Sequence, residues 1–373
     1  MIHSSVKVKI IRLQFLFVVS FLFADPAIYA TGQYNNPQAK EKHIKNNLYA
    51  GVNLSLYEHY WEKPDTLLQG NITSKLQEIR DAGFTCVRLP VAFDLFLQHG
   101  TYVLRPELIQ KLKDAYATCT KLDLSLIITY HYGKLDDNNG FEEREKIISI
   151  WKQVQNVFKD QGGNDLLFDL YNEPTVNRNN WKRDISYIAK SLRTEDANRY
   201  YVIGGTNYNS IDELMEMGKL DVDKILYEFH FYEPFIFTHQ GADWTEGKTN
   251  ITNLPYPYKS KEMPKLSKTA KGTVTEDDYD RYPTEATRQY VRYRLKSVVR
   301  FCKRRKMPVI CTETGAINIA DDTYRENYFA DITSTLYDLN VPTIFWDYDQ
   351  KFSLNAKSSG KLLKSIRDWL KAN

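Results

Sequence analysis

The chain has 373 residues, which suits one large domain or two ordinary ones. Its 42% hydrophobic and 26% charged residues are ordinary values for a soluble globular protein. The formal net charge is only +3, which argues against a nucleic-acid partner, since such a partner would need a basic face. Aromatic residues reach 13%, with 26 tyrosines, and Tyr and Trp suit contacts with sugar rings but also fill cores.

The N-terminal segment has the layout of a secretory signal peptide. Three cationic residues precede an almost wholly apolar run over residues 13–24, and small residues follow as far as Ala30. The apolar run is too short to span a bilayer comfortably. We therefore expect export to the periplasm or the medium, cleavage near Ala30, and no membrane association of the mature chain 31–373. Loss of residues 1–30 removes three cations and one anion, so the net charge falls from +3 to +1.

The four cysteines are Cys86, Cys119, Cys302 and Cys311. They form no CxxC pair, so the sequence indicates neither a zinc ribbon nor a redox motif. Cys86 and Cys311 lie in apolar, strand-like runs, which is typical of buried thiols. Export permits disulfides, but the spacing does not show whether any form.

Short apolar runs alternate with longer helical patterns from about residue 47 onward. The runs are Tyr49–Leu54, Thr85–Leu89, Ser125–Tyr130, Leu166–Leu170, Tyr200–Gly204, Ile225–Phe229, Pro308–Thr312 and Pro342–Trp346. The helical patterns are Ile72–Ala82, Pro106–Lys121, Glu143–Lys159, Trp181–Arg193, Glu285–Arg304, Asp322–Leu339 and Leu362–Leu370. Apolar strands separated by amphipathic helices are typical of a parallel sheet covered by helices. Eight such strands predict a single α/β domain, a (β/α)8 TIM barrel.

One segment interrupts this alternation of strands and helices. Residues 245–282 are rich in Lys, Thr, Pro, Asp and Tyr and have no helical period. They follow the sixth predicted strand, so we expect a long loop on the C-terminal face of the barrel, where loops usually shape the substrate site. A surface insertion without function is an equally open interpretation.

Polar or aromatic residues stand at the C-terminal ends of six of the eight predicted strands. They are Arg88 on strand two, His131 after strand three, Asn172 and Glu173 after strand four, His230 and Tyr232 after strand six, Glu313 on strand seven and Trp346 on strand eight. Barrel enzymes place their chemistry at these ends. Together they predict an active site.

The two carboxylates carry the prediction of chemistry. Glu173 and Glu313 are far apart in sequence, yet each ends an apolar strand, on opposite sides of a small barrel mouth. Glycoside hydrolysis needs such a pair, in which one carboxyl protonates the leaving oxygen and the other attacks or activates water. A strand-end Glu on its own would more often be a solvated rim charge, so the pair is what favours catalysis.

The motifs also carry a family resemblance. They are Val87-Arg88-Leu89-Pro90, Tyr130-His131-Tyr132, Leu170-Tyr171-Asn172-Glu173-Pro174, Phe229-His230-Phe231-Tyr232, Thr312-Glu313-Thr314-Gly315 and Phe345-Trp346. In this order and spacing the chain resembles glycoside hydrolase family 5, the cellulase-type family. The resemblance implies a retaining mechanism with Glu173 as acid/base and Glu313 as nucleophile. It also implies supporting or substrate-binding roles for the six other strand-end residues, Arg88, His131, Asn172, His230, Tyr232 and Trp346.

Each supporting role has a physical reason. Arg88 is permanently charged and would hold the Glu313 carboxylate ionised. Asn172 would donate to the sugar 2-hydroxyl, Tyr232 would hydrogen-bond Glu313, and Trp346 would stack under a sugar ring. The two histidines, His131 and His230, are more ambiguous, because a core histidine is usually a satisfied hydrogen bonder.

Further aromatic residues have open interpretations. Trp61 and Trp244 are candidate sugar platforms, with simple packing as likely a role in each case. Tyr132 stands where many relatives of the family carry a second histidine, a departure that would alter substrate contacts rather than chemistry. No H-E-x-x-H or comparable ligand spacing occurs, so we expect no metal and no other cofactor.

The leading hypothesis for function is a secreted, monomeric endo-β-1,4-glucanase that acts on a β-glucan polysaccharide. A β-mannanase or a xyloglucanase would use the same carboxylates. A carbohydrate-binding barrel without catalysis is disfavoured by the presence of both glutamates, and a metal-dependent barrel hydrolase by the absence of ligand spacing.

Overall fold

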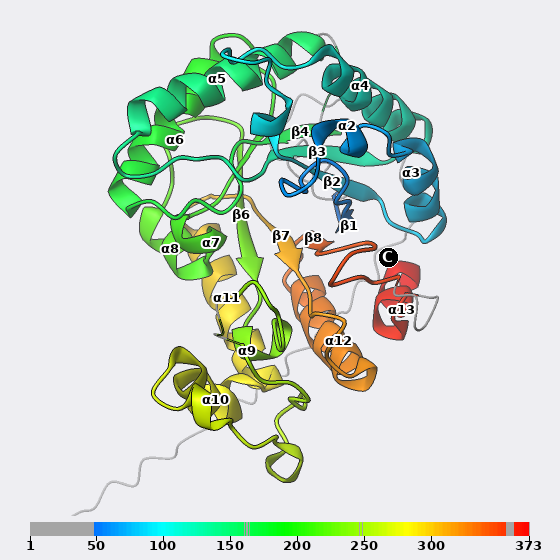
Figure 1. The fold of residues 1–373 in the computed structure, drawn as a ribbon, viewed down its shortest axis with the longest axis vertical. Coiled ribbons are helices and arrows are strands. Elements are labelled where there is room, and N and C mark those ends of the chain that lie inside the picture. Colours follow the sequence, from blue (N-terminus) through cyan, green and yellow to red (C-terminus); the bar gives the residue numbers. More distant parts are fainter. Residues whose placement is uncertain are drawn as a thin grey trace, which may run out of the picture.

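The computed structural model describes residues 48–159, 161, 163, 165–245, 247, 249–355 and 362–372. They form a closed barrel of eight parallel strands that are neighbours in chain order (Figure 1). The strands are β1 Ala50–Asn53, β2 Cys86–Val91, β3 Ser125–Tyr130, β4 Leu166–Asp169, β5 Tyr201–Ile203, β6 Ile225–Phe231, β7 Val309–Thr314 and β8 Thr343–Phe345. The predicted (β/α)8 barrel is confirmed. The predicted signal peptide, residues 1–30, lies outside the described residues.

Helices surround the barrel (Figure 1). The longer ones are α3 Ile72–Asp81, α4 Pro106–Lys121, α5 Gly140–Val157, α6 Arg178–Arg193, α11 Arg288–Arg304 and α12 Asp322–Asp338, and α13 Lys364–Ala372 ends the described chain. Shorter elements are α2 Pro64–Leu67, α7 Thr206–Asn209, α8 Ile211–Met217, α9 Phe235–Thr238 and the 3-10 turns Phe93–Phe96, Ser260–Glu262 and Lys268–Ala270. All seven predicted helical patterns coincide with observed helices, although several ends differ by a few residues.

Helix α4 illustrates why these segments fold as they do. Pro106 occupies its first turn, where its missing N–H costs nothing. Its buried residues recur every three or four positions, which gives one apolar face toward the strands. A basic residue, Lys121, lies in the last turn, where it complements the helix dipole.

The prediction of an unbroken loop over residues 245–282 is wrong in part. The segment does follow β6, but it contains two 3-10 turns and the start of α10, Val274–Glu285. Only Thr275 and Tyr282 of this helix are buried, and Pro283 lies in its last turn. A helix that packs through so few residues shows no apolar period in its sequence. In Figure 1, α10 and the neighbouring turns extend away from the ring of helices.

The barrel interior changes character along its axis. Toward the N-terminal ends of the strands it is filled by a closed apolar cluster, to which nearly every strand contributes. Its members are Leu48, Cys86, Ile127, Leu167, Val202, Leu226, Ile310 and Ile344. All four cysteines are buried free thiols, which answers the question that their spacing left open. Toward the C-terminal ends, the interior side chains become polar.

No helix within the described part of the chain has the length and apolar character needed to cross a membrane.

Ile127 has no exposed surface in the apolar interior cluster. We expect Ile127→Ala to lower the free energy of unfolding by about 2–5 kcal/mol, because it removes buried methyl groups and leaves a cavity. The measurement is the urea midpoint followed by tryptophan fluorescence. Val274→Ala is the control, since Val274 is 51% exposed and should change stability by less than about 0.5 kcal/mol. Equal midpoints for the two variants would contradict the packing described here.

Candidate active site

Arg88, on β2, is the centre of the polar end of the barrel and has no exposed surface. Its guanidinium donates to Asp169 from Nε at 2.9 Å and from Nη2 at 2.8 Å. Nη1 donates to Glu313 Oε1 at 2.6 Å and to Asn53 Oδ1 at 2.9 Å, and Nη2 donates to Asn172 Oδ1 at 2.7 Å. Because these partners come from β1, from β7 and from β4 and the turn after it, one side chain ties four strands together.

A third buried carboxyl, Glu228, lies close to the Arg88 charge. Glu228, on β6, has no exposed surface, and both its burial and the charge of Asp169 raise its pKa well above the usual range. It accepts hydrogen bonds from Thr312 and, at 3.1 Å, from Asn209 Nδ2. Asp169 Oδ2 accepts both hydrogen bonds from Arg88, and Oδ1 is left without a partner among these groups. A protonated Glu228 that donates to Asp169 satisfies this oxygen and avoids two adjacent buried negative charges.

The two predicted catalytic glutamates face each other at the barrel mouth. One oxygen of each carboxyl and His230 Nδ1 all lie within 4.8 Å of one another. Glu173 follows β4 in a left-handed backbone conformation, with φ of 50°, which is rare outside glycine and is concentrated at functional sites. Its side chain remains 30% exposed, whereas that of Glu313 is 5% exposed. Glu173 is therefore the more accessible of the two carboxyls, and Glu313 is the more deeply buried.

A register shift on β7 sets the position of Glu313. Phe229 of β6 pairs with Cys311, but the next residue, His230, pairs with Glu313. The extra residue, Thr312, bonds Glu228 inside the barrel, and Glu313 bonds Arg88 there as well. A regular strand would turn successive side chains to opposite faces. The bulge lets two adjacent residues serve the interior.

His230, on β6, contacts both carboxyls, and Tyr232, just after β6, contacts Glu313. His230 Nδ1 lies 2.7 Å from Glu173 Oε1 and 3.4 Å from Glu313 Oε2. The Tyr232 hydroxyl donates to Glu313 Oε2 at 3.0 Å, which is the contact the sequence predicted. His230 is not a separate core histidine: it lies between the two carboxyls.

Asn172, His131 and Trp346 complete the predicted set. Because Asn172 Oδ1 accepts from Arg88, its NH2 group is left as a donor for a ligand. His131 is stacked on Trp346, with ring centroids 5.9 Å apart and an angle of 11°. Neither ring nitrogen of His131 has a hydrogen-bond partner in the protein, so it differs from the satisfied core histidine that was one interpretation of the sequence. Gly315 packs against Trp346 so closely that a Cβ there would overlap the Trp346 carbonyl oxygen.

The surroundings of the two glutamates separate their roles. Burial raises the pKa of Glu173 to about 7, against a smaller opposing effect of the Arg88 charge. Burial also raises the pKa of Glu313, while His230 and Arg88 lower it. Since Glu313 alone bonds Arg88 and Tyr232 directly, it ionises first and Glu173 keeps its proton longer. Burial lowers the pKa of His230 to about 4, so this imidazole is neutral near pH 7.

These residues line a cleft of about 840 Å3. Its walls come from the segments that follow β1, β3, β4, β6 and β8, and from the end of β7. The lining residues are Ser55, Glu58, His59, Tyr60, Trp61, Glu62, His131, Tyr132, Asn172, Glu173, Tyr232, His239, Asp243, Trp244, Glu313, Trp346, Asp347, Gln350, Lys351 and Phe352. Both predicted platforms, Trp61 and Trp244, are among them. Arg88 and His230 do not line the cleft, but they contact the carboxyls that do.

The exposed aromatic residues stand on different sides of this cleft. Trp61 is 62% exposed and stacks on His59, with ring centroids 4.8 Å apart. Tyr132 is 43% exposed and contacts Tyr60, with ring centroids 4.7 Å apart. Trp244 is 46% exposed, but the Lys351 ammonium lies 4.2 Å from its ring centre. One face of Trp244 is thus already partly covered.

Sequence reasoning missed two groups of residues. The first is the cleft wall after β1 and β8, including Glu58, Tyr60 and Asp347. The rule about strand ends would have found them, had it been applied to strand one and extended past Trp346. The second group comprises buried polar residues below the mouth, such as Asp169 and Glu228. A carboxyl inside an otherwise apolar strand was the available signal for these.

Among the described residues, Glu173, His230 and Glu313 are also the group whose ligand atoms lie close enough to hold a metal ion. The contacts of all three are already explained by hydrogen bonds within the site.

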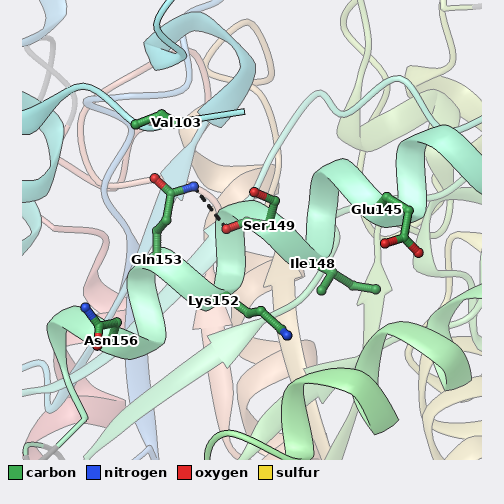
Figure 2. Close-up of a pocket in the computed structure, with 7 residues that line it drawn as sticks. All are labelled: Val103, Glu145, Ile148, Ser149, Lys152, Gln153 and Asn156. Carbon is green, nitrogen blue, oxygen red and sulfur yellow. Dashed lines mark hydrogen bonds between the residues drawn. The ribbon is translucent and has the colours of Figure 1, made fainter. Parts of the chain in front are cut away.

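A second hollow, of about 590 Å3, lies on the outer surface (Figure 2). It is lined by Val103, Glu145, Ile148, Ser149, Lys152, Gln153 and Asn156, all but the first from α5. Figure 2 shows Gln153 bonded to the backbone oxygen of Ser149, at 3.0 Å. The hollow contains one carboxyl, Glu145, and no facing acid, so it lacks the paired groups of the barrel mouth.

Two facing carboxyls at this spacing, one buried and one partly exposed at the mouth of a closed barrel, below a cleft with aromatic walls, are typical of a glycoside hydrolase. A profile of the family described as Cellulase (glycosyl hydrolase family 5) matches residues 41–352. The chain belongs to this family, as its motifs predicted, and is a glycoside hydrolase.

Relatives and solved structures agree with this assignment. The chain is 28% identical over 294 residues to Endoglucanase C of Acetivibrio thermocellus, covering 74% of this chain and 84% of that protein. It is 26% identical over 319 residues to Endoglucanase 3 of Fibrobacter succinogenes, covering 79% of this chain and 48% of that protein. The crystal structure of endoglucanase Cel5A from Thermotoga maritima shares the fold, with a TM-score of 0.73 at 20% identity over 89% of this chain and 99% of that one.

The pKa of Glu173 predicts the basic limb of the pH profile. Glu173 must be protonated to donate, so activity should be lost as pH rises through about 7. Glu313 must be ionised to attack, so activity should also be lost as pH falls through its pKa. We expect a bell-shaped dependence of kcat/KM on a β-glycoside whose leaving group needs protonation, and loss of the basic limb in the residual activity of Glu173→Gln. A basic limb that persists in this variant would assign it to another group.

Proposed function

We propose that the protein is an exported, retaining endo-β-1,4-glucanase. The observation that carries the mechanism is the approach of the Glu173 and Glu313 carboxylate oxygens to within 4.8 Å. Retaining enzymes hold their carboxyl groups about 5–5.5 Å apart, whereas inverting enzymes need about 6.5–9.5 Å to admit a water molecule between carboxyl and sugar. The short separation therefore favours direct attack by a carboxylate.

The reaction has two steps. A Glu313 oxygen attacks the anomeric carbon, and the bond to the leaving oxygen breaks as Glu173 transfers its proton to that oxygen. In the second step Glu173 takes a proton from water, the water oxygen attacks the anomeric carbon, and the ester bond to Glu313 breaks. Both glutamates return to their starting protonation states.

The surrounding residues serve this cycle. Formation of the ester removes the negative charge of Glu313, which lowers the pKa of Glu173 and converts it from acid to base. The free NH2 group of Asn172 is available for the sugar 2-hydroxyl, a contact that strengthens in the transition state. Trp346 lines the cleft and offers a stacking surface to the same sugar.

The choice of a β-1,4-glucan rests on the relatives and on the cleft. The relatives described above are named endoglucanases, and one structural neighbour is an endo-β-1,4-glucanase in complex with substrate. Exposed aromatic residues follow β1 and β6, on different sides of the mouth. Their placement suits a polysaccharide that crosses the site, as endo cleavage requires. Thermotoga maritima Cel5A has also been solved with mannotriose, so mannan is a second candidate substrate.

The direct test is reducing-sugar release from carboxymethylcellulose, barley β-glucan, xyloglucan, xylan and mannan. We expect activity on the first two, and a fall of at least about 10,000-fold in Glu313→Gln, which lacks a nucleophile. Proton NMR of the first products should show the β-anomer, as retention requires. Glu107→Gln is the matched control, because Glu107 is a solvent-exposed residue of α4 outside the cleft.

Each other outcome is informative. Activity confined to mannan or xyloglucan would change the substrate and leave the mechanism in place. Initial release of the α-anomer would overturn the retaining mechanism. Folded protein that releases sugar from none of the five polysaccharides would overturn the glucanase proposal.

We also propose export, on the basis of the basic, apolar and small segments within residues 1–30. Expression of the full chain in a bacterial host should yield protein outside the cytoplasm with a new N-terminus close to residue 31, as measured by N-terminal sequencing. Replacement of the apolar run 13–24 by a polar sequence is the control and should keep the protein inside. Uncleaved full-length chain in the cytoplasm would contradict the proposal.

A further inference from the structure

The turn after β5 carries a residue, Asn209, that contacts His230 from behind and lies outside the motifs of the family resemblance. Asn207, Tyr208 and Asn209 have positive φ values of 51°, 60° and 53°. Three consecutive non-glycine residues in the left-handed region are costly, and such conformations persist where the surroundings require them. The first two side chains are exposed, whereas Asn209 has no exposed surface. The turn therefore directs Asn209 into the barrel.

Packing fixes Asn209 in place. A Cβ at Gly204 would overlap the Asn209 amide oxygen, so the glycine provides the space that the side chain occupies. The Thr206 hydroxyl lies 2.6 Å from the Val176 carbonyl oxygen and 3.0 Å from that of Pro174. The same turn is thus tied to the segment that carries Glu173.

The amide of Asn209 bridges two interior groups. Its Nδ2 lies 3.1 Å from Glu228 Oε1 and 3.3 Å from His230 Nε2. On the other side of the ring, His230 Nδ1 lies 2.7 Å from Glu173 Oε1. Since Nδ1 faces carboxylate oxygens, it carries the proton; since Nε2 faces an N–H donor, it must accept. An imidazolium would place two N–H groups against each other at Nε2.

We propose that Asn209 is a positioning residue that holds His230 in the neutral, Nδ1-protonated form, so that the imidazole donates a hydrogen bond to Glu173 and brings no positive charge to the catalytic carboxyls. A charged His230 would favour the ionised form of Glu173 and remove the proton that the leaving group needs. This inference rests on the proposed role of Glu173 as the acid/base.

Several other charged or titratable groups face His230. They are Glu173 after β4, Glu313 on β7, Arg88 on β2, Asp169 on β4 and His131 after β3, with Glu228 of β6 behind Asn209. The acids favour the imidazolium, and Arg88 opposes it. Burial of the ring and the Asn209 donor therefore have to outweigh the charges of Glu313 and Asp169, so substitution of the Asn209 amide should change the protonation of His230.

The test is Asn209→Asp in the full-length chain. Aspartate tolerates the left-handed backbone but presents an acceptor to Nε2, which should then take a second proton. The imidazolium N–H would lie nearer to Glu173 than the new carboxylate behind the ring, so the basic limb of kcat/KM should move to lower pH by about 1 unit or more. Asn207→Asp is the matched control, because it adds the same charge in the same turn on an exposed side chain. Its basic limb should stay at the wild-type position.

A second measurement does not depend on any substrate. Long-range 1H–15N NMR of histidine-labelled protein, with His230 assigned by its loss in His230→Gln, should show the Nδ1-protonated neutral tautomer in the wild type and the imidazolium in Asn209→Asp near pH 6. If the aspartate variant does not fold, Asn209→Gly removes the donor without backbone strain and should move the basic limb in the same direction.

An Nε2-protonated His230 in the wild type would overturn the proposal, as would a folded Asn209 variant whose basic limb and tautomer match the wild type. Failure of the glucanase proposal would instead appear as absent hydrolysis with the tautomer unchanged.

Discussion

A single buried cation organises the catalytic end of this barrel. Arg88 has no contact with water, and an unpaired charge in such a place would be strongly destabilising. Its neutralisation therefore requires acids at fixed positions, and these acids are Asp169 and Glu313. One of the groups that balance the buried charge, Glu313, is also the proposed nucleophile, so the same contact serves stability and the proposed chemistry. The same pairing favours the ionised carboxylate that attack requires.

Around this cation, the interior gives four carboxyls different surroundings. Asp169 and Glu313 bond the guanidinium directly, while Glu228 lies beside Asp169 and Glu173 reaches into the cleft. Because each has different neighbours, one proton is kept on Glu228 and another on Glu173. An enzyme of this kind depends on neighbouring acids that do not titrate together. The neutral His230 belongs to the same arrangement, since it contacts both catalytic carboxyls without adding charge.

Much of this architecture could be predicted from the sequence. Eight apolar runs predicted the strands, because buried parallel strands are mostly apolar. The polar and aromatic residues at the ends of these runs predicted the mouth of the barrel. Helix α10 escaped because it packs through two residues only. Asn209 was not predicted, because its contact with His230 depends on a left-handed backbone conformation that no residue pattern indicates. The roles of Asp169 and Glu228 depend on which side chains meet inside the barrel. A carboxyl within an apolar strand can be seen in the sequence, but its partners lie too far along the chain for a local motif to identify them.

The bulge on β7 has a consequence for how such a site can change over time. With Thr312 present, both it and Glu313 serve the interior. Without Thr312, Glu313 would follow Cys311 directly and would take the inward place that Thr312 now has beside Glu228, one position before the level at which it contacts Arg88 and Tyr232. A single-codon deletion here would therefore withdraw the proposed nucleophile into the barrel, away from the cleft, although the reading frame and the closed apolar cluster would be unchanged. The loops at the mouth can change in length without moving Glu313, whereas β7 cannot. A change of substrate must therefore come from the loops.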